Sequence, residues 1–134
     1  MPIDPASAGR DFPPADPVAL AQADIDAFNE AVGFRGPTAA PTFAFRLVVA
    51  AWQPMLADPS LDIALDRLVH ADQRFALTRP LVAGDEVVAT ARLTGVRPTA
   101  GVDRLVVDTH LRTVDGEDLG SSTSTLLCSH RTSA

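Results

Sequence analysis

The sequence contains a single cysteine, no lysine and no long uninterrupted hydrophobic run. One cysteine cannot form an internal disulfide or a cysteine-rich metal site, so we interpret Cys128 as a small buried apolar residue of a protein in a reducing compartment. No stretch approaches the roughly 20 apolar residues of a membrane span, and the first residues do not join a cationic region to an apolar one. We therefore expect a soluble protein of the cytoplasm.

The charge is biased toward the acidic side. Eleven cationic side chains, all of them arginine, stand against 17 carboxylates and give a net charge of −6. A phosphate backbone would repel such a domain, which argues against nucleic acid as a partner. The 134 residues are 46% hydrophobic, which suffices for a single domain over residues 1–134 with its own core. This composition excludes a disordered chain and a disulfide-stabilised miniprotein.

Prolines punctuate the N-terminal segment, residues 1–17, which we predict to be extended and without helix. Asp16 and Pro17 then read as a helix start, an N-cap residue followed by proline at the first helical position. The helix is predicted to end at Gly33. Its apolar residues recur at roughly helical spacing: Val18, Leu20, Ile25, Phe28 and Val32.

The connector from Gly33 to Pro41 contains two glycines and two prolines and is predicted to be a loop. The segment after it, residues 42–53, is apolar except at Thr42, Arg46 and Gln53. A helix that is apolar nearly all round must be covered by other parts of the protein. We therefore predict a central buried helix over about residues 42–56, ended by Pro54 and by the Asp58-Pro59 pair.

From residue 65 onward the hydrophobic period changes from helical to alternating, which indicates antiparallel strands. We predict strands over 65–78, 86–97, about 105–112 and about 118–129, with Asp115-Gly116 as the last turn. The alternation puts His70, Asp72 and Arg74 on one face of the first strand. The apolar faces are expected to hold Val69, Ala71, Gln73, Phe75 and Leu77 in that strand, and Val87, Ala89, Ala91, Leu93, Leu105, Val107, Thr109 and Leu111 in the next two.

These elements predict the α+β class, specifically the hot-dog fold. An antiparallel sheet of about five strands has one apolar face to bury, and the 42–56 helix is the element apolar enough to fill it. Such a sheet leaves one edge strand unpaired. Pairing of that edge with a second hot-dog chain, as a dimer with a continuous sheet, would remove it.

Several segments together resemble the MaoC-like hydratases and dehydratases, in particular the N-terminal-type, FAS1-like dehydratase half. The most specific are Gln73-Arg74-Phe75, Arg79-Pro80-Leu81 and Ala83-Gly84-Asp85. The remaining ones are Gly9-Arg10-Asp11-Phe12, IDAFNEAVG, Ala40-Pro41-Thr42-Phe43 and TVDGEDLGSSTSTLL. The resemblance implies a substrate carried as a coenzyme A or acyl carrier protein thioester, bound across the dimer interface. It also implies an Asp and a His that move the proton and the water, in the loop before the central helix.

The chain departs from that family pattern at the loop itself. The segment from Gly33 to Pro41 holds neither Asp nor His and is shorter than the usual family loop, which carries Asp-x-Asn-Pro-x-His. The positions five residues before the three histidines are Leu65, Leu105 and Thr125. The resemblance therefore implies the non-catalytic subunit of a heterodimeric (3R)-hydroxyacyl-ACP dehydratase, whose catalytic MaoC-like partner supplies the pair. No metal site and no redox cofactor are expected.

The remaining site candidates are weighed residue by residue. His70 and Asp72 read either as a substitute acid/base pair or, as we prefer, as a polar ladder on the sheet surface. Asp108 and His110 have the same spacing, and two ligand-type residues are too few for a metal site. His130, near the C-terminus, is given no role, and the Ser/Thr run at 121–125 is interpreted as sheet surface. Arg46 requires a carboxylate, a carbonyl array or a ligand phosphate, and we favour an internal ion pair.

Substrate contacts are expected around the start of the central helix. Thr42 and Phe43 present backbone amides that could receive a thioester oxygen. The aromatic residues Phe34, Phe43, Phe45 and Trp52 could line an acyl channel, although core packing explains each of them equally well.

The sequence thus predicts a subunit of a (3R)-hydroxyacyl-thioester dehydratase or enoyl-thioester hydratase that shapes the acyl pocket. An acyl-binding or scaffold homodimer without catalysis is the alternative from another class. A thioesterase is disfavoured because no acidic residue occurs between Gly33 and Asp58. A biosynthetic cyclase stays open, since orientation in an apolar pocket can accelerate an intramolecular step.

Overall fold

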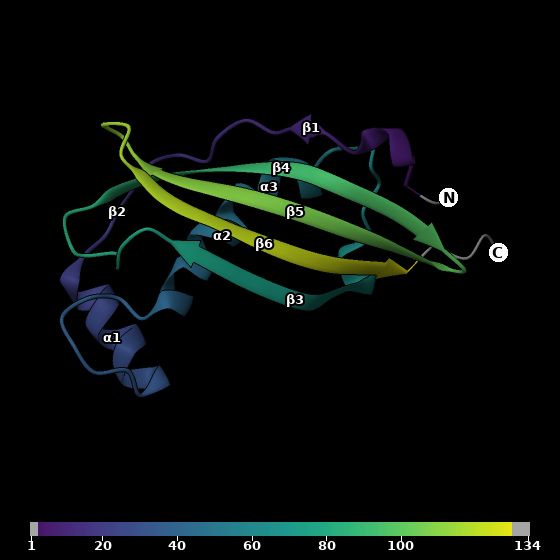
Figure 1. The fold of residues 1–134 in the computed structure, drawn as a ribbon. Helices are drawn as coiled ribbons and strands as arrows, with labels where there is room; N and C mark the ends of the chain where they lie inside the picture. Colours follow the sequence, from purple (N-terminus) through teal and green to yellow (C-terminus); the bar gives the residue numbers. More distant parts are fainter. Residues whose placement is uncertain (1–2, 130–134) are drawn as a thin grey trace.

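A computed structural model describes residues 3–129 of the chain, and Figure 1 shows its arrangement. Four long antiparallel strands form one curved sheet, with the central helical segment against its concave side and α1 projecting at one end. The elements in chain order are η1 (Pro5–Ser7), β1 (Arg10–Asp11), β2 (Val18–Ala19), α1 (Gln22–Val32), η2 (Pro41–Ala44), α2 (Phe45–Ala51), α3 (Gln53–Leu56), η3 (Leu65–Arg67), β3 (Leu68–Leu77), β4 (Glu86–Thr99), β5 (Val102–Thr113) and β6 (Asp118–Ser129).

The sheet has the order β1-β4-β5-β6-β3, and the two-residue strand β2 also pairs with β4. The long strands β4, β5 and β6 follow one another as a meander, while β3 joins the far side of β6. Among the described residues β3 pairs with β6 alone, so its other edge is free. No helix in the described range is long and apolar enough to cross a membrane.

The concave face of the sheet carries the core, as the alternation predicted. Every apolar position expected on the inner faces of β4 and β5 is almost fully buried, from Val87 to Leu111. Phe43, Leu47, Val48, Ala51 and Met55 bury the matching side of the central segment. The predicted sheet around an apolar helix is therefore confirmed, with four long strands and two very short ones.

The N-terminal predictions were partly wrong. A short 3-10 turn, η1, occurs at Pro5–Ser7, where the Asp4 carboxylate accepts a hydrogen bond from the Ala6 amide at 2.9 Å. Proline is compatible with the first position of such a turn, so a high proline content does not exclude one. Pro17 does not start a helix either: Val18 pairs with Val87 of β4, and α1 begins only at Gln22. The end was predicted correctly, because Gly33 adopts the left-handed conformation with φ 75°.

The central helix spans the predicted range with a different internal structure. It opens as the 3-10 turn η2 at Pro41–Ala44, continues as α2 and passes through Trp52 into α3. Pro54 does not end the helical segment. It lies in the first turn of α3, where a backbone N–H has no acceptor within that helix, so the missing N–H of proline costs no helical hydrogen bond.

Candidate functional site

The connector before the central helix is held in place by one buried side chain, that of Asn29 on α1. Its amide nitrogen donates to the carbonyl oxygens of Thr38 at 2.8 Å and Gly36 at 3.4 Å, and its oxygen accepts from the Ala40 amide at 2.9 Å. Asn29 is only 4% exposed, and its bond from the Ala40 amide is buried, while the two bonds to carbonyl oxygens are part-buried. The segment that carries the proton-transferring residues in the resembled family is here a tied-down loop without a carboxylate or an imidazole.

A hollow of about 530 Å³ opens between α1, the central segment and β3, and we call it the central groove. Most of the predicted substrate contacts come together there. Thr42, Phe43, Phe45 and Arg46 lie along one side of it, and His70 lies on the other. The complete lining is Phe28, Val32, Thr42, Phe43, Phe45, Arg46, His70, Gln73 and Phe75.

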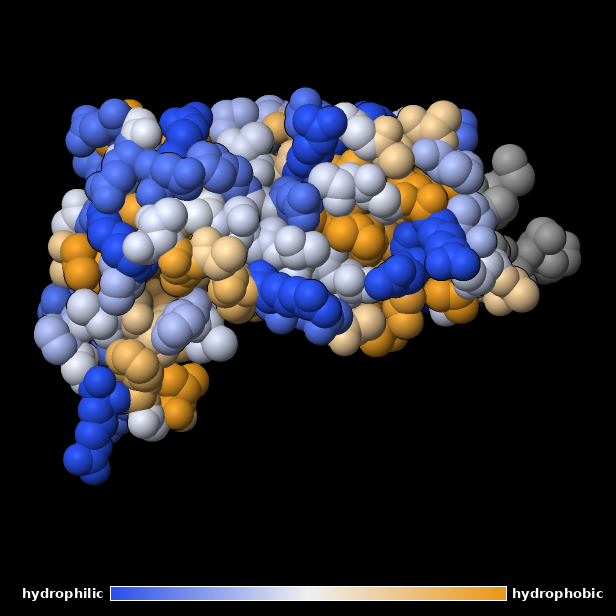
Figure 2. Space-filling model, in the orientation of Figure 1, coloured by the Kyte–Doolittle hydropathy of each residue, from blue (hydrophilic) through white to orange (hydrophobic). Residues whose placement is uncertain are grey.

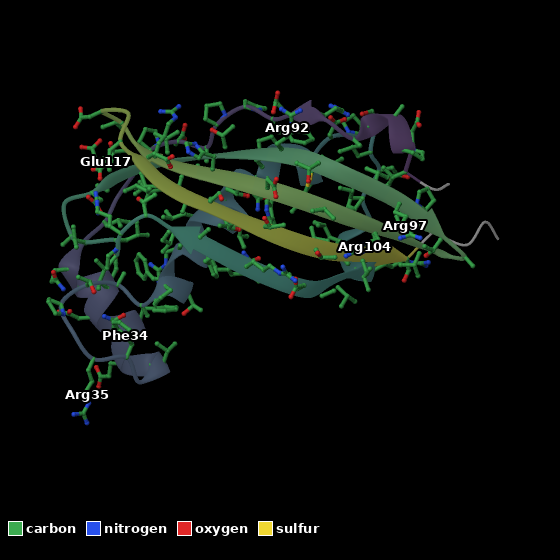
Figure 3. The ribbon with its side chains drawn as sticks, viewed as in Figure 1. Phe34, Arg35, Arg92, Arg97, Arg104 and Glu117 are labelled. Atoms are coloured by element: carbon green, nitrogen blue, oxygen red, sulfur yellow. The ribbon has the colours of Figure 1, made fainter. Side chains whose placement is uncertain are left out.

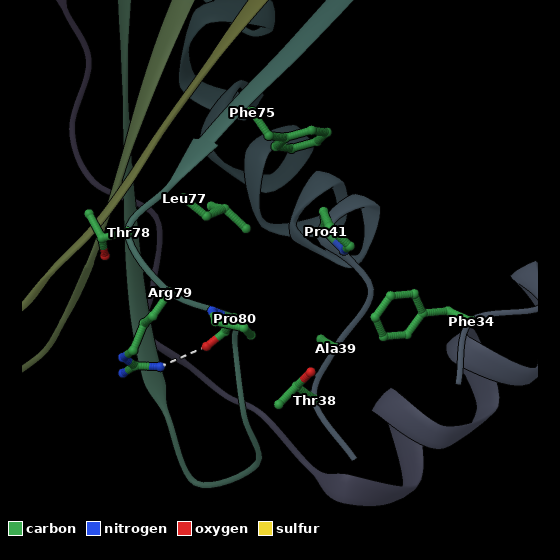
Figure 4. Close-up of a pocket in the computed structure, with 9 residues that line it drawn as sticks. All are labelled: Phe34, Thr38, Ala39, Pro41, Phe75, Leu77, Thr78, Arg79 and Pro80. Carbon is green, nitrogen blue, oxygen red and sulfur yellow. Dashed lines mark hydrogen bonds between the residues drawn. The ribbon is translucent and has the colours of Figure 1, made fainter. Parts of the chain in front are cut away.

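A second hollow, of about 450 Å³, lies against the connector (Figure 4). Phe75 lines both hollows. Phe34 lines this second hollow, together with Thr38, Ala39, Pro41, Leu77, Thr78, Arg79 and Pro80. Figure 3 shows Phe34 and Arg35 at the end of the molecule where α1 projects from the sheet. Phe34 therefore lines the second hollow and not the central groove, where Thr42, Phe43, Phe45 and Arg46 lie.

Two details of the predicted contacts need correction. The Phe43 amide is not free, because it donates to the carbonyl of Ala40 at 2.9 Å, and only Thr42 keeps the predicted availability. Trp52 lines neither hollow: it is 5% exposed and packs edge-on against Phe45, with ring centroids 5.8 Å apart. Its indole N–H is buried with no hydrogen-bond acceptor among the described residues. The binding role of the other contacts stays a prediction.

His70 and Asp72 do not share a face of β3, contrary to the simple alternation. A β-bulge lies between them, so that His70 pairs with Leu126 while Asp72 pairs with Thr125. The extra residue reverses the side-chain direction after it. His70 therefore points inward with Leu126, which is fully buried, and Asp72 lies on the outer face next to Arg74, at 3.3 Å. A substitute acid/base pair of these two residues is excluded by this geometry.

The bulge instead brings His70 and Gln73 together in a polar network on the inner face. The imidazole Nε2 lies 3.0 Å from Gln73 Oε1. The hydroxyl of Ser124 donates to the same oxygen at 2.6 Å, and Gln73 Nε2 donates to Ser122 Oγ at 2.7 Å. The predicted position of Gln73 among apolar neighbours does not by itself predict this network. The signal was visible, because an amide on an otherwise apolar face needs buried partners.

Arg46 has no carboxylate partner within residues 3–129, so the favoured ion pair was wrong. Its guanidinium lies 4.3 Å from the ring centroid of Phe43 and 5.9 Å from that of Phe28. Such cation–π contacts hold the side chain over the groove while leaving its N–H donors unused. The central groove therefore combines apolar walls with one cation and one imidazole.

The Arg79-Pro80-Leu81 and Ala83-Gly84-Asp85 motifs form a structural clamp. Arg79 makes two hydrogen bonds to Asp85, at 2.9 and 3.0 Å, and two to Glu117, at 2.9 and 3.1 Å. The Arg79 guanidinium lowers the pKa of the Asp85 carboxyl, which also accepts a hydrogen bond from the Val82 amide. This clamp joins the β3–β4 connection to the tip of the β5–β6 hairpin, where Figure 3 shows Glu117.

The outer face of the sheet carries the remaining polar candidates. His110 lies 3.0 Å from Asp118, whose pKa is lowered first by the Gly120 amide and then by His110. Thr123 donates to Asp108 at 3.0 Å. Within the described range no three His, Cys, Asp or Glu side chains gather as a metal site would require. His130 lies outside the described residues. Figure 3 places Arg97 and Arg104 together at the opposite end of the sheet from Glu117.

Residues 19–120 match the model of the "FAS1-like, dehydratase domain region". A UPF0336 protein of Cutibacterium acnes is 39% identical over 133 residues, which cover 94% of each chain.

Solved structures agree on the fold. A chain of the HadBC (3R-hydroxyacyl-ACP dehydratase) complex of Mycobacterium tuberculosis superposes with a TM-score of 0.79 at 22% identity, over 95% of this chain and 99% of that one. A MaoC-like dehydratase superposes equally well, with a TM-score of 0.79 at 22% identity, over 92% of this chain and 42% of that longer one. The predicted hot-dog fold is thereby confirmed.

Proposed function

The chain belongs to the FAS1-like dehydratase family, and from that premise we propose that it is one subunit of a (3R)-hydroxyacyl-thioester dehydratase or enoyl-thioester hydratase. In this proposal the chain shapes the acyl pocket, and a second hot-dog chain supplies the Asp and the His. The observation that carries it is the connector of residues 33–41. It joins Val32 to Thr42, which both line the central groove, contains no aspartate, glutamate or histidine, and is tied to Asn29.

The chemistry explains why a second chain is needed. Loss of water from a 3-hydroxyacyl thioester requires a base for the α-proton, an acid for the leaving hydroxyl and donors for the developing enolate. The groove offers an apolar channel, the Arg46 guanidinium and the amide of Thr42. It offers no carboxylate, because none lines it.

The free edge of β3 supports the same proposal. Along the ten residues of this strand, the main-chain N–H and C=O groups that point away from β6 have no strand partner in the described range. Figure 2 shows hydrophobic patches along the border of the molecule where β3 runs in Figure 1. Leu65 and Val69, at the start of this edge, are 61% and 58% exposed. A second hot-dog chain added to β3 would pair this edge and lie beside the groove.

The proposal is tested by hydration of crotonyl-CoA and of a longer enoyl-CoA. The purified chain is assayed alone and after co-expression with a hot-dog protein of the same host that carries Asp-x-x-x-x-His. We expect turnover from the pair, no turnover from this chain alone, and loss of activity when the partner's Asp or His is replaced. Strong hydration by this chain alone, unchanged in His70→Ala, contradicts the proposal.

The alternative, an acyl-binding homodimer without catalysis, is favoured by the same groove and the same free edge, which a second copy of this chain could also cover. It predicts thioester binding by a homodimer, and no turnover with any partner of the host. The same assay therefore separates the two functions.

A further inference from the structure

The imidazole of His70 is the polar group most firmly oriented toward the central groove. We propose that its Nδ1 accepts a hydrogen bond from the 3-hydroxyl of the bound acyl group and so selects hydroxyacyl over saturated thioesters. This assignment rests on the proposed function and adds a specificity-determining residue on β3, in this chain rather than in its partner.

The hydrogen bonds of Gln73 determine which imidazole nitrogen is free. The carbonyl oxygen of Arg74 can only accept, and Gln73 Nε2 lies 3.5 Å from it, which identifies that end of the side chain as the NH₂ group. Gln73 Oε1 is then the atom 3.0 Å from His70 Nε2. Because an amide oxygen cannot donate, Nε2 must carry the proton. In the neutral ring Nδ1 is left as an acceptor, and it has no partner among the described residues.

The network behind Gln73 is buried deeply enough to hold this arrangement rigidly. Ser122 is 1% exposed and Ser124 is fully buried, although both lie on the face of β6 that otherwise packs against the core. Burying hydroxyls and an amide in this layer costs free energy unless every group is paired. Here each hydroxyl is bonded to Gln73. Such a network holds the imidazole of His70, which lies at its end, in one orientation. Hydrogen bonds act in the same way in active sites where one residue positions another.

Aromatic contacts fix the imidazole ring from the other side. The ring of Phe45 is stacked on it, with a centroid distance of 5.1 Å and an angle of 7°. Trp52 meets it edge-on at 5.8 Å. His70 is thus oriented by contacts before any ligand binds, which lowers the entropic cost of a directed hydrogen bond.

The surroundings in the groove match a hydroxyl better than a charged group. Its walls are the rings of Phe28, Phe43 and Phe75, which suit an alkyl chain, and the nearest cation on them is Arg46. A 3-hydroxyacyl chain places one donor hydroxyl within an apolar chain. That pattern fits the exposed imidazole of His70, which lines a largely apolar groove together with the polar side chains of Thr42 and Gln73.

The test compares 3-hydroxybutyryl-CoA with butyryl-CoA as probes of the full chain, purified with any partner that accompanies it. Titration calorimetry is expected to give about two- to tenfold tighter binding of the hydroxyacyl probe, the range for one net hydrogen bond. His70→Phe keeps an aromatic ring against Phe45 and should remove the preference while leaving butyryl-CoA affinity within about twofold. Nitrogen NMR should show the His70 Nδ1 signal shifting with the hydroxyacyl probe alone, and His110, on the outer face, serves as the internal control.

The outcomes separate the assignment from the function on which it rests. If both probes bind and His70→Phe retains the wild-type preference, the assignment is wrong and the proposed function stands. If neither probe binds, the proposed function is contradicted and the assignment falls with it. Should His70→Phe fail to fold, Gln73→Leu provides the second variant. It removes the acceptor for Nε2–H, and the preference and the single-tautomer NMR signature of His70 are both expected to be lost.

Discussion

The side-chain oxygen of Asn29 accepts a hydrogen bond from the backbone amide of Ala40 at 2.9 Å, in a buried setting. This contact ties the C-terminal half of α1 to the residue that precedes the central helix. It thereby helps to fix the course of the connector, whose residues Thr38, Ala39 and Pro41 line the second hollow.

We expect Asn29→Ala to lower the free energy of unfolding by about 1–3 kcal/mol, because three backbone groups of the connector lose their buried partner. Gln22→Ala is the matched control. It also removes a bond from α1 to the connector, to the Pro37 carbonyl at 3.1 Å, but at an exposed position. Its cost should stay below about 0.5 kcal/mol. Equal costs in urea unfolding would show that burial of Asn29 contributes nothing.

Gly120 is required by a close approach of the backbone. An added β-carbon would lie 2.1 Å from the Ala76 carbonyl oxygen, and φ at this position is +108°. Gly120→Ala should therefore cost well over about 2 kcal/mol. Gly116→Ala also has a positive φ, +95°, but meets nothing within 4 Å, and should cost about 1 kcal/mol. The difference between the thermal unfolding midpoints of the two variants measures the steric contribution to the cost at Gly120. Identical midpoints would argue against the close contact.

The Arg79 clamp predicts a particular acid sensitivity. The pKa of Asp85 is lowered in the folded protein, mainly by Arg79, so the unfolded state binds protons more readily. The stabilisation is complete above the unfolded pKa of about 4 and is lost as the pH falls through the lower folded value. In Asp85→Asn, unfolding followed from pH 7 to pH 2 should show lower stability at neutral pH and a shallower acid limb. An acid limb as steep as that of the wild type would contradict the linkage.

Arg46 is expected to be dispensable for folding. It has aromatic contacts and no ion pair in the described range, so Arg46→Met, which keeps an apolar stem against Phe43, should change the free energy of unfolding by less than about 0.5 kcal/mol. A loss of 2 kcal/mol or more, diminished by salt, would instead reveal the internal ion pair that the sequence suggested.

The sequence predicted those elements whose residues follow one uninterrupted period. In β4 and β5 alternation placed Val87 and Leu111 correctly, because a regular antiparallel pair keeps every second residue on one face. In β3 the predicted faces hold from Asp72 to Leu77 but are wrong for Val69 and His70, because an extra residue in a bulge reverses the faces and has no signature in hydrophobicity. The His70–Gln73 network depends on that bulge, so it could not be assembled from spacing alone.

Proline was the second source of error, in both directions. Asp16 and Pro17 predict a helix start, yet pairing of Val18 with β4 outweighs that local signal. Pro54 predicts a helix end, yet it fits the first turn of α3. Proline is compatible with more than one backbone conformation at each position. Pairing with the sheet decides the conformation at Pro17, and the preceding helical turn decides it at Pro54.

The central claim is that this chain works as half of a pair, and native mass spectrometry of the tagged chain purified from its own host tests it most directly. We predict a hetero-oligomer with a second hot-dog chain that carries an Asp-x-x-x-x-His loop. A spectrum containing only homodimers of this chain, from preparations that also hydrate enoyl-CoA, would contradict the account.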